Sequence, residues 1–364
     1  AQPSRVEGTW VNGSYNSNIG TVSARTAING TTVLAYRGQS TATSATRTIL
    51  FNNSGGSYNP KWVANNATPL AKNTRLSGGA VRFTSGGTDI NFVTVQNSYY
   101  TFIIGNSGST NNDLAIWETS YNPTTISSVS RSFSTVDATQ SPTITVTMAN
   151  ALGTNERVYV YYSTDNFATS GNSAFVQLSA LNGSFQGTAS IPTFTAGTTV
   201  TYYVLTTANT TPTFADVQYQ SLNIFNGTAQ NTTAANFSYT VTAAGPTPTI
   251  TLGPPTSGTY SANVGATSGV QTSSVTGTNL TANISVTAPA YYEVSSDGGT
   301  TWASSATFTQ SGGNVSGTLS IRYKPTAGEN AVAKTISLTS TGATTVNYTA
   351  TGTAANSITV QFQQ

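Results

Sequence analysis

The sequence predicts an all-β chain of three β-sandwich domains in a row, with no substantial helix. Runs of β-branched and aromatic residues alternate with polar ones and end at Gly, Asn, Asp or Ser, which is the pattern of short strands joined by turns. In residues 199–205, for example, Val200, Tyr202 and Val204 share one face of a predicted strand. We find no window of about 11 to 18 residues with the apolar spacing of a helix. Short strands at this density are typical of β-sandwiches.

The length and the proline-rich segments divide the chain into domains. At roughly 100–200 residues per domain, a chain of 364 residues corresponds to about two to four domains. The clearest linker is 243–248, because Pro246 and Pro248 deny hydrogen bonds to a sheet and favour an extended spacer. A second boundary falls near Pro123. We predict an N-terminal sandwich at 1–125, a second sandwich at 126–245, a third at 246–355 and an extra C-terminal strand at 356–364.

The composition excludes several classes of enzyme and of structural site. Charged residues make up only 7% of the chain, against about 25% in an average soluble domain. The chain has no histidine and no cysteine. It therefore cannot form, by itself, a disulfide, a zinc site, a haem ligand, a cysteine nucleophile or a Ser-His-Asp triad. We identify no catalytic residues, and we predict a protein that is not an enzyme and has no cofactor.

Charge and hydropathy limit which partners and which cellular location we expect for the protein. Thirteen Lys and Arg residues against eleven Asp and Glu residues give a net charge of +2. The basic residues form no cluster, so nucleic acid is not an expected partner. No stretch approaches the ~18–20 apolar residues of a membrane span. Residues 1–5 lack an apolar signal-peptide core, and the Thr-rich, charge-poor composition favours an extracellular or cell-surface protein whose signal peptide has been removed.

One local pattern occurs twice. Residues 161–167 and 291–302 each combine an aromatic strand, a turn centred on an Asp and a following aromatic residue. Asp and Gly supply the conformations that tight turns require. The pattern indicates related modules in the second and third predicted domains.

These segments resemble the Ig-like modules of large secreted multi-domain surface proteins of Bacteroidota, which are commonly substrates of type IX secretion. The motifs that carry the resemblance lie at 275–287, 293–302, 321–325 and 346–352 in the third domain, at 158–167 and 199–204 in the second, and at 114–123 in the first. The resemblance implies Ig-like sandwiches on a secreted surface protein, and its motifs carry no catalytic residues. Such proteins normally end in a sorting domain, and none is visible here. That absence implies cleavage on export or a different route.

The acidic residues offer only weak candidates for chemistry. Asp113 and Glu118 flank Trp117 and are the nearest pair for a glycosidase, against the simpler interpretation as a turn residue and a solvated strand end. Asp165 and Asp297 lie in the repeated pattern, where each either helps to form a carbonyl-rich Ca²⁺ site or is only a turn residue. We predict no metal site.

Aromatic residues provide an alternative site. Trp10, Trp62 and Trp117 are candidates for an exposed platform that binds surface glycans. The competing interpretation places them in the core, where a Trp within an alternating strand is more often found.

The C-terminal segment gives the sharpest prediction. Ile358, Val360 and Phe362 alternate with polar residues beyond the predicted closing strand of the third sandwich. An unpaired apolar strand is a hazard. Two interpretations remain open: the segment adds a strand to the next copy in trans, or it is an edge strand of its own domain in cis.

The leading functional hypothesis is a non-catalytic structural subunit of an extracellular assembly: a filament, sheath or surface layer. Its main partner would be itself, in a homopolymer built by head-to-tail β-strand contacts. The alternatives are a cell-surface adhesin or glycan-binding module, and an accessory region of a larger secreted enzyme.

Overall fold

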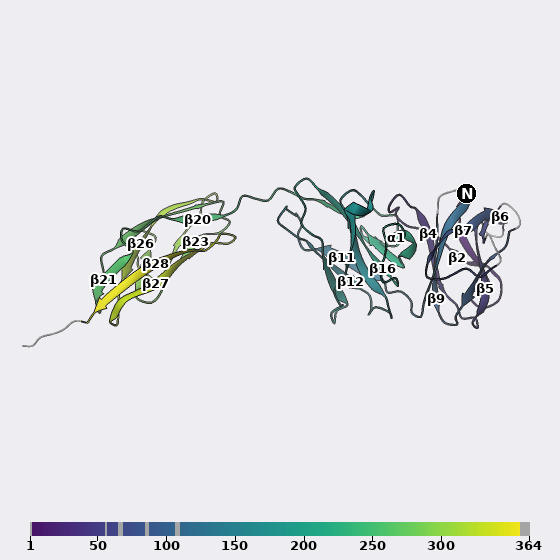
Figure 1. Ribbon diagram of the computed structural model, residues 1–364, viewed down its shortest axis with the longest axis horizontal. Helices are drawn as coiled ribbons and strands as arrows, with labels where there is room; N and C mark the ends of the chain where they lie inside the picture. Colours follow the sequence, from purple (N-terminus) through teal and green to yellow (C-terminus); the bar gives the residue numbers. More distant parts are fainter. Residues whose placement is uncertain (1, 55–56, 65–67, 84–86, 106–109, 357–364) are drawn as a thin grey trace, which may run out of the picture. The chain divides into compact units, whose positions relative to one another are not determined.

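The structure is a computed structural model that describes residues 2–54, 57–64, 68–83, 87–105 and 110–356 (Figure 1). It contains two compact units, residues 1–244 and 245–364. Besides strands, the described residues hold one four-residue α-helix, α1 (Val217–Gln220), and one 3-10 turn, η1 (Ser170–Asn172). The predicted all-β fold class of tandem β-sandwiches without substantial helix is confirmed.

The first sandwich is one antiparallel sheet of ten strands that folds over itself. The strands are β1 (Arg5–Gly8), β2 (Asn16–Thr21), β3 (Ser23–Ala24), β4 (Val33–Gln39), β5 (Ala45–Ser54), β6 (Ser57–Val63), β7 (Arg75–Phe83), β8 (Ile90–Thr94), β9 (Tyr99–Gly105) and β10 (Asn111–Thr119). They run in the order β2-β1-β5-β6-β7-β10-β9-β4-β3, with β8 on β5. Phe51 of β5 and Phe102 of β9 are four strands apart in this order, yet their ring centroids are only 6.4 Å apart. The two halves of the sheet therefore enclose a common core.

The middle sandwich has a sheet of three strands facing a larger one. The smaller sheet is β11-β12-β15, made of β11 (Ile126–Arg131), β12 (Thr143–Met148) and β15 (Gln186–Ser190). The larger runs β14-β13-β16-β17-β18, with β19 also on β16, and consists of β13 (Arg157–Ser163), β14 (Ser173–Gln177), β16 (Thr199–Thr207), β17 (Asn223–Asn226), β18 (Ala229–Gln230) and β19 (Phe237–Thr240). Val200, Tyr202 and Val204 lie in the core between the two sheets. The period-2 pattern of residues 199–205 thus faces its predicted apolar side inward.

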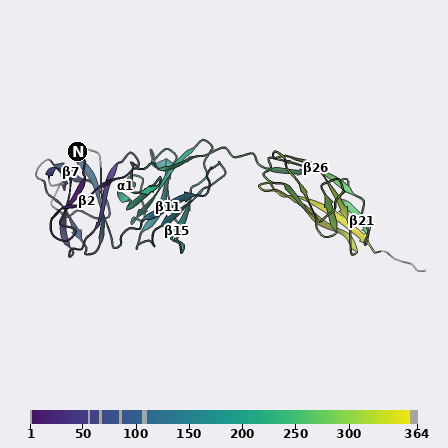
Figure 2. The same cartoon turned by 180° about the vertical axis from the view of Figure 1, so that it is seen from behind.

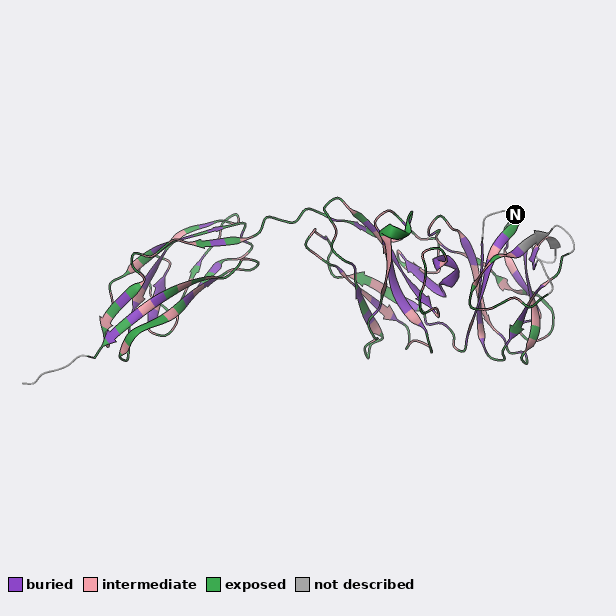
Figure 3. Cartoon of the chain, in the orientation of Figure 1, coloured by how far each residue is buried: buried purple, intermediate pink, exposed green. Residues whose placement is uncertain are grey.

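The third sandwich pairs sheets of four and five strands. The four-stranded sheet is β20-β22-β26-β24, made of β20 (Thr249–Leu252), β22 (Gln271–Thr278), β26 (Val315–Tyr323) and β24 (Tyr292–Ser295). The five-stranded sheet is β21-β28-β27-β23-β25, made of β21 (Thr259–Asn263), β28 (Val346–Ala355), β27 (Glu329–Thr339), β23 (Ile284–Thr287) and β25 (Ser305–Phe308). β21 runs parallel to β28. Buried and exposed residues alternate along these strands (Figure 3), as the buried Ser273, Val275 and Gly277 of β22 illustrate.

The boundaries of the units show which domains are joined. The break between Ala244 and Gly245 falls in the proline-containing segment 243–248. Near residue 125, by contrast, the sheets change but the compact unit continues, because the first and middle sandwiches share no strand and still form one unit. The contacts that join these two sandwiches form the best-developed site in the described part of the chain.

Candidate functional site

The first and middle sandwiches meet along an insertion of the middle sandwich. β16 ends at Thr207 and β19 begins at Phe237, and α1, β17 and β18 lie between them. β17 pairs with β16, which anchors the insertion on its own sandwich. α1 lies on the side of the middle sandwich that faces the first one in both views (Figures 1 and 2), and all four of its residues are buried.

Apolar side chains from both sandwiches form one part of this interface. Trp117 of β10 packs with Tyr219 and Leu222 of the insertion. Its indole Nε1–H donates a hydrogen bond to the carbonyl oxygen of Tyr219 at 2.5 Å. Ile28 of the first sandwich joins a cluster of the middle sandwich that includes Tyr161. Since a fully buried aliphatic side chain contributes roughly 1.5–3 kcal/mol, the interface behaves as an extension of the two cores.

Two arginines of the first sandwich bind the backbone of the insertion. Arg25 donates hydrogen bonds to the carbonyl oxygens of Ser221 at 2.6 Å and Leu222 at 2.9 Å. Arg37 of β4 donates to the same Leu222 carbonyl at 2.5 Å and to Oδ1 of Asn223 at 3.0 Å. The planar guanidinium presents several donors in a fixed geometry, which suits adjacent carbonyl groups. The pair thus forms an arginine clamp, consisting of Arg25 and Arg37, on residues 221–223.

The clamp carries buried positive charge without an ion pair. Arg25 is only 3% exposed, and neither arginine is in a salt bridge with a carboxylate of the described residues. Burial, together with the nearby charge of Arg37, lowers the pKa of Arg25 to about 9. Burial also lowers the pKa of Arg37 to about 10, although Glu156 acts in the opposite direction. The carbonyl groups that follow α1 supply partial negative charge in place of a counter-ion.

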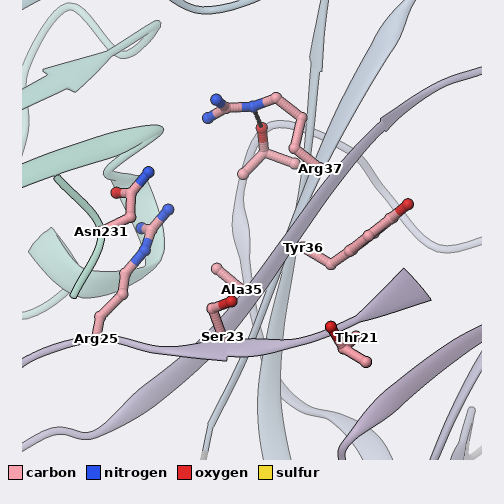
Figure 4. Close-up of a pocket in the computed structure, with 8 residues that line it drawn as sticks. Thr21, Ser23, Arg25, Ala35, Tyr36, Arg37 and Asn231 are labelled. Carbon is pink, nitrogen blue, oxygen red and sulfur yellow. Dashed lines mark hydrogen bonds between the residues drawn. The ribbon is translucent and has the colours of Figure 1, made fainter. Parts of the chain in front are cut away.

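A pocket of about 320 Å³ lies beside the clamp. Figure 4 shows Arg25 next to Asn231 of the middle sandwich. Arg37 donates a hydrogen bond from Nε to the Thr101 hydroxyl, at 2.8 Å. The rest of the lining comes from the first sandwich and includes Tyr36. Because the clamp arginines already bind backbone carbonyls and Thr101, the arrangement fixes the insertion against β4 and β9.

A third arginine, Arg75, contacts both sandwiches at the interface. Arg75 of β7 donates from Nε to Asp113 of its own sandwich at 2.8 Å and from Nη1 to Asp216 of the insertion at 2.7 Å. Its guanidinium also lies 4.6 Å from the ring centroid of Tyr219. One cation therefore joins both sandwiches through two carboxylates and an aromatic face.

All eleven acidic side chains of the sequence bind partners within the fold. Six form ion pairs: Asp89, Asp113, Glu118, Asp216, Glu293 and Glu329. Two accept hydrogen bonds in buried positions: Glu7 and Glu156. Three cap turns: Asp137, Asp165 and Asp297. The glycosidase candidates Asp113 and Glu118 are thus bound by Arg75 and Lys72.

The carboxylates of Asp165 and Asp297, each in a turn, also accept hydrogen bonds from their own chain. Asp165 accepts hydrogen bonds from the Ala168 N–H and the Thr169 hydroxyl, at 3.1 and 2.6 Å. Asp297 accepts the equivalent bonds from the Thr300 N–H and the Thr301 hydroxyl, at 3.0 and 2.6 Å. Among the described residues, no group of three or more acids could hold a metal ion. The hydrogen bonds of Asp165 and Asp297 are those of turn-capping residues.

The three tryptophans predicted for a glycan platform are buried. Trp10 is 0%, Trp62 1% and Trp117 4% exposed. Trp10 and Trp62 fill the core of the first sandwich, and Trp117 lies in the interface with the insertion. The glycan-binding assignment of these residues is wrong, because the folded sheet and the insertion cover the rings that a sugar would have to stack on.

The predicted C-terminal strand lies largely outside the described residues. Ile358, Val360 and Phe362 all belong to residues 357–364, which the structure does not describe. Their role as a donor strand stays a prediction. In the described part of the chain, no helix has the length and apolar character needed to cross a membrane.

Comparisons with known proteins give only distant likenesses. No protein-family model and no curated protein matches the chain. Similar solved structures include the complex of Dpr2 Ig1-Ig2 with DIP-Theta Ig1-Ig3, at 10% identity over 63% of this chain and 99% of that chain, with a TM-score of 0.28. Latent PorU from Porphyromonas gingivalis is 10% identical over 97% of this chain and 34% of that one, with a TM-score of 0.21.

A surface-layer protein also appears among these structures. Domains 4–9 of SbsC are 11% identical over 98% of this chain and 48% of that chain, with a TM-score of 0.18. The chain thus spans about a third of the PorU chain and about half of the SbsC chain. Likenesses of this strength carry no argument about what the chain does.

Sequence reasoning missed the interface and its arginine clamp. Arg25 and Ser221 are 196 residues apart, and no local pattern connects them. One signal was present: the strands at 199–207 and 237–240 are separated by a much longer segment than the turns elsewhere. That segment contains α1, β17 and β18, so it is an insertion with its own secondary structure rather than a turn.

Proposed function

We propose that this chain is a non-catalytic structural subunit of an extracellular assembly, a filament, sheath or surface layer, in which copies join head-to-tail through β-strands. The observation that carries the proposal is the position of β28. The C-terminal half of this strand, residues 351–355, is paired with β27 on one side and with β21 on the other, and the alternating apolar segment 358–362 follows it closely in the sequence. Because the end of β28 already has both neighbours, we expect that segment to pair elsewhere, and non-closing head-to-tail contacts produce fibres.

Two further observations support a structural role. Each acidic side chain is bound by a group of the same chain, and these contacts stabilise turns, ion pairs and the interface between the two sandwiches. The arginine clamp, Arg75 and the apolar interface join two sandwiches into one unit, which would help a subunit to transmit force along a fibre. The charge-poor, Thr-rich, cysteine-free composition supports an extracellular location, and the motif resemblance supports export of the kind used by Bacteroidota surface proteins.

The alternatives have less support. A glycan-binding adhesin would need exposed aromatic rings, and the three candidates, Trp10, Trp62 and Trp117, are buried. An accessory region of a secreted enzyme would require catalytic residues on another part of a longer protein. Neither alternative explains an apolar alternating segment after a strand whose C-terminal half is already paired on both sides.

Negative-stain electron microscopy tests the proposal. The full chain and a variant truncated after Ala355 would be purified and compared at matched concentrations, with circular dichroism and melting curves as the control for folding. We expect regular fibres or sheets from the full chain and only monomers from the truncated one. Monomers from a folded full-length chain would refute the proposal.

A further inference from the structure

Several sheet edges of the described residues are covered by neighbouring backbone or side chains. Bare edges invite pairing with other chains, and proteins usually block them. The blocking hydrogen bonds are Leu70 N–H to Asn91 O and Lys72 Nζ to Val93 O on β8, Ser179 N–H to Thr188 O and Asn182 N–H to Gln186 O on β15, and Val294 N–H to Ala303 O on β24. β11 has a bulge and carries Arg131, which are also protective features.

β14 is an edge without such a cover. It pairs with β13 and with no other described strand. The bonds from Leu178 N–H to Val158 O and from Thr164 N–H to Asn172 O, both 2.9 Å, fix which residues face β13. In an antiparallel ladder these are every second residue, so the N–H and C=O groups of Phe175 and Gln177 point away from β13. In the described part of the chain, no backbone group bonds to them.

A small pocket lies beside this edge. It has a volume of about 150 Å³, and its lining combines Tyr162, Ala174 and Phe194 with the polar residues Thr164, Asn172 and Ser173 and with Gly171. Tyr162 and Ala174 are opposite each other in the ladder, so their side chains lie on the same face. The ring centroids of Tyr162 and Phe194 are 5.9 Å apart. Because Ala174 is small, it leaves space that one larger apolar side chain would fill.

We propose that residues 356–364 of a second copy of this chain add a strand to the free edge of β14 and insert one of their apolar side chains into this pocket. The inference rests on the proposed function and names the acceptor. In an added strand every second side chain lies on one face of the sheet, so Ile358, Val360 and Phe362 would share the face of Ala174. Neither 356–364 nor β14 carries a charged side chain, so pairing buries no charged side chain. Nine extended residues span about 30 Å, which is more than the five residues of β14 require.

The register of β14 allows the edge to be blocked without breaking the sandwich. The N–H of Gln177 faces outward, and proline is tolerated in an edge strand where the missing N–H faces solvent. Gln177→Pro should therefore leave the melting temperature of the unit 1–244 nearly unchanged. It should raise the protein concentration needed for assembly by about tenfold or more, since one lost pairing bond and the clash of the ring amount to at least about 1.4 kcal/mol. Gln177→Ala, which keeps the N–H, is the matched control and should assemble normally.

Disulfide trapping tests the contact directly, because the chain has no native cysteine. One protein would carry Ala174→Cys, and a second, in separate preparations, Ile358→Cys, Val360→Cys or Phe362→Cys. Residues opposite each other in a pair without mutual hydrogen bonds are close enough for a disulfide. We expect an inter-chain disulfide with at least one tail variant. The acceptor control is Thr188→Cys on the covered strand β15, for which we expect about tenfold less product.

The outcomes separate this inference from the proposed function. Fibres from Gln177→Pro at normal concentrations, or cross-linking to Thr188→Cys in preference to Ala174→Cys, would overturn the acceptor and leave the structural role standing. A disulfide formed only within a single chain that carries Ala174→Cys and Val360→Cys would place the segment in cis and overturn the inference. Monomeric full-length protein in the microscope would instead refute the proposed function itself.

Discussion

The middle and third sandwiches build the same turn with different residues. In the middle sandwich the hydroxyl of Ser163 donates to Asp165 at 2.7 Å and accepts the N–H of Phe167 at 2.8 Å. In the third, Ser295 donates to Asp297 at 2.6 Å and accepts the N–H of Gly299 at 2.9 Å. The spacing Ser-x-Asp-x-x-x-Thr is the same at 163–169 and 295–301. The hydrogen bonds of the Ser, Asp and Thr side chains thus specify the turn in both.

The difference lies in how each turn accommodates its left-handed backbone. Gly298 and Gly299 have φ values of +74° and +89°, which glycine adopts without strain. The middle turn places Phe167 at φ +62°, where a bulky residue is costly. The Phe167 ring stacks on Tyr161 at a centroid distance of 4.9 Å, and this packing offsets the strain. A turn defined by side-chain hydrogen bonds can therefore tolerate a strained residue when its ring packs in the core.

The two sandwiches also differ in the segment that comes after a long central strand. In the middle sandwich β16 leads into the insertion that docks the first sandwich. In the third, β26 is the strand that pairs with the one before the shared turn, as β16 does in the middle sandwich. β26 ends at Tyr323 and β27 begins at Glu329, so only a short connection follows it. Among the described residues, the insertion is therefore a feature of the middle sandwich and not of the third at this position. Substitutions in the clamp and in the shared turn, and a change of pH, test these differences.

Removing a clamp arginine should have the largest effect, and only on one unit. Arg25→Ala leaves the carbonyl group of Ser221 buried without its donor, whereas the Leu222 carbonyl keeps its hydrogen bond from Arg37. The unsatisfied group costs about 1–3 kcal/mol and the cavity left by the buried side chain adds to this cost, so we expect the unit 1–244 to lose about 3–4 kcal/mol of unfolding free energy. Differential scanning calorimetry of the full chain should show this unit melting earlier and the third sandwich unchanged.

The control for this experiment is an arginine outside the interface. Arg5 makes one exposed hydrogen bond, to Asn18, at 3.5 Å, and Arg5→Ala should change stability by less than about 0.5 kcal/mol. A loss at Arg25→Ala no larger than that at Arg5→Ala would mean that the clamp does not hold the sandwiches together.

The fold was predictable because its pattern is local, whereas the interface was not. Val200, Tyr202 and Val204 show their buried face within five residues of sequence. The partners of Arg25 lie almost two hundred residues away, and nothing near Arg25 distinguishes a buried arginine from an exposed one. Trp117 was misjudged for the same reason, because its cover comes from the insertion. Local alternation gives the faces of a strand but does not show which segment covers each face.

The shared turn should respond to one substitution in both sandwiches, but not equally. Ser163→Ala and Ser295→Ala each remove a buried hydroxyl that accepts two backbone N–H groups and donates to the Asp. We expect a loss of about 2 kcal/mol in each unit. The middle sandwich should lose about 1 kcal/mol more, because the turn that holds Phe167 at positive φ is weakened. Urea unfolding of each variant, followed by fluorescence and calorimetry, would measure both losses.

Exposed serines of the same sandwiches provide the controls. Ser130→Ala in β11 and Ser285→Ala in β23 remove solvent-facing hydroxyls and should have effects below about 0.5 kcal/mol. If Ser295→Ala proved the more damaging of the two turn substitutions, the strain at Phe167 would not be the feature that distinguishes the turns.

Acid should destabilise the third sandwich more than the first unit, by a difference of about a few degrees in melting temperature. In the third sandwich, hydrogen bonds from Ser295 and Thr301 lower the pKa of Asp297. Burial opposes the shift at Glu293 and Glu329, but bonds from Arg322 and Lys334 lower both of those pKa values too. A lowered folded-state pKa gives stability above the unfolded pKa of about 4, and this stability is lost as pH falls through the folded pKa.

In the unit 1–244, folding lowers the pKa of some carboxyl groups and raises the pKa of others. Hydrogen bonds, with that from Thr169 the largest, lower the pKa of Asp165, whereas burial raises the pKa values of Glu7 and Glu156. A carboxyl with a raised folded-state pKa binds its proton more tightly when folded, so its contribution becomes more favourable as pH falls through that pKa. Glu7 and Glu156 should therefore offset part of the stability that this unit loses at low pH. Calorimetry between pH 7 and about pH 3 measures the melting temperature of each unit. If the melting temperature of the unit 1–244 fell as much as that of the third sandwich, or more, the buried glutamates would not compensate for the stability lost at the other acids.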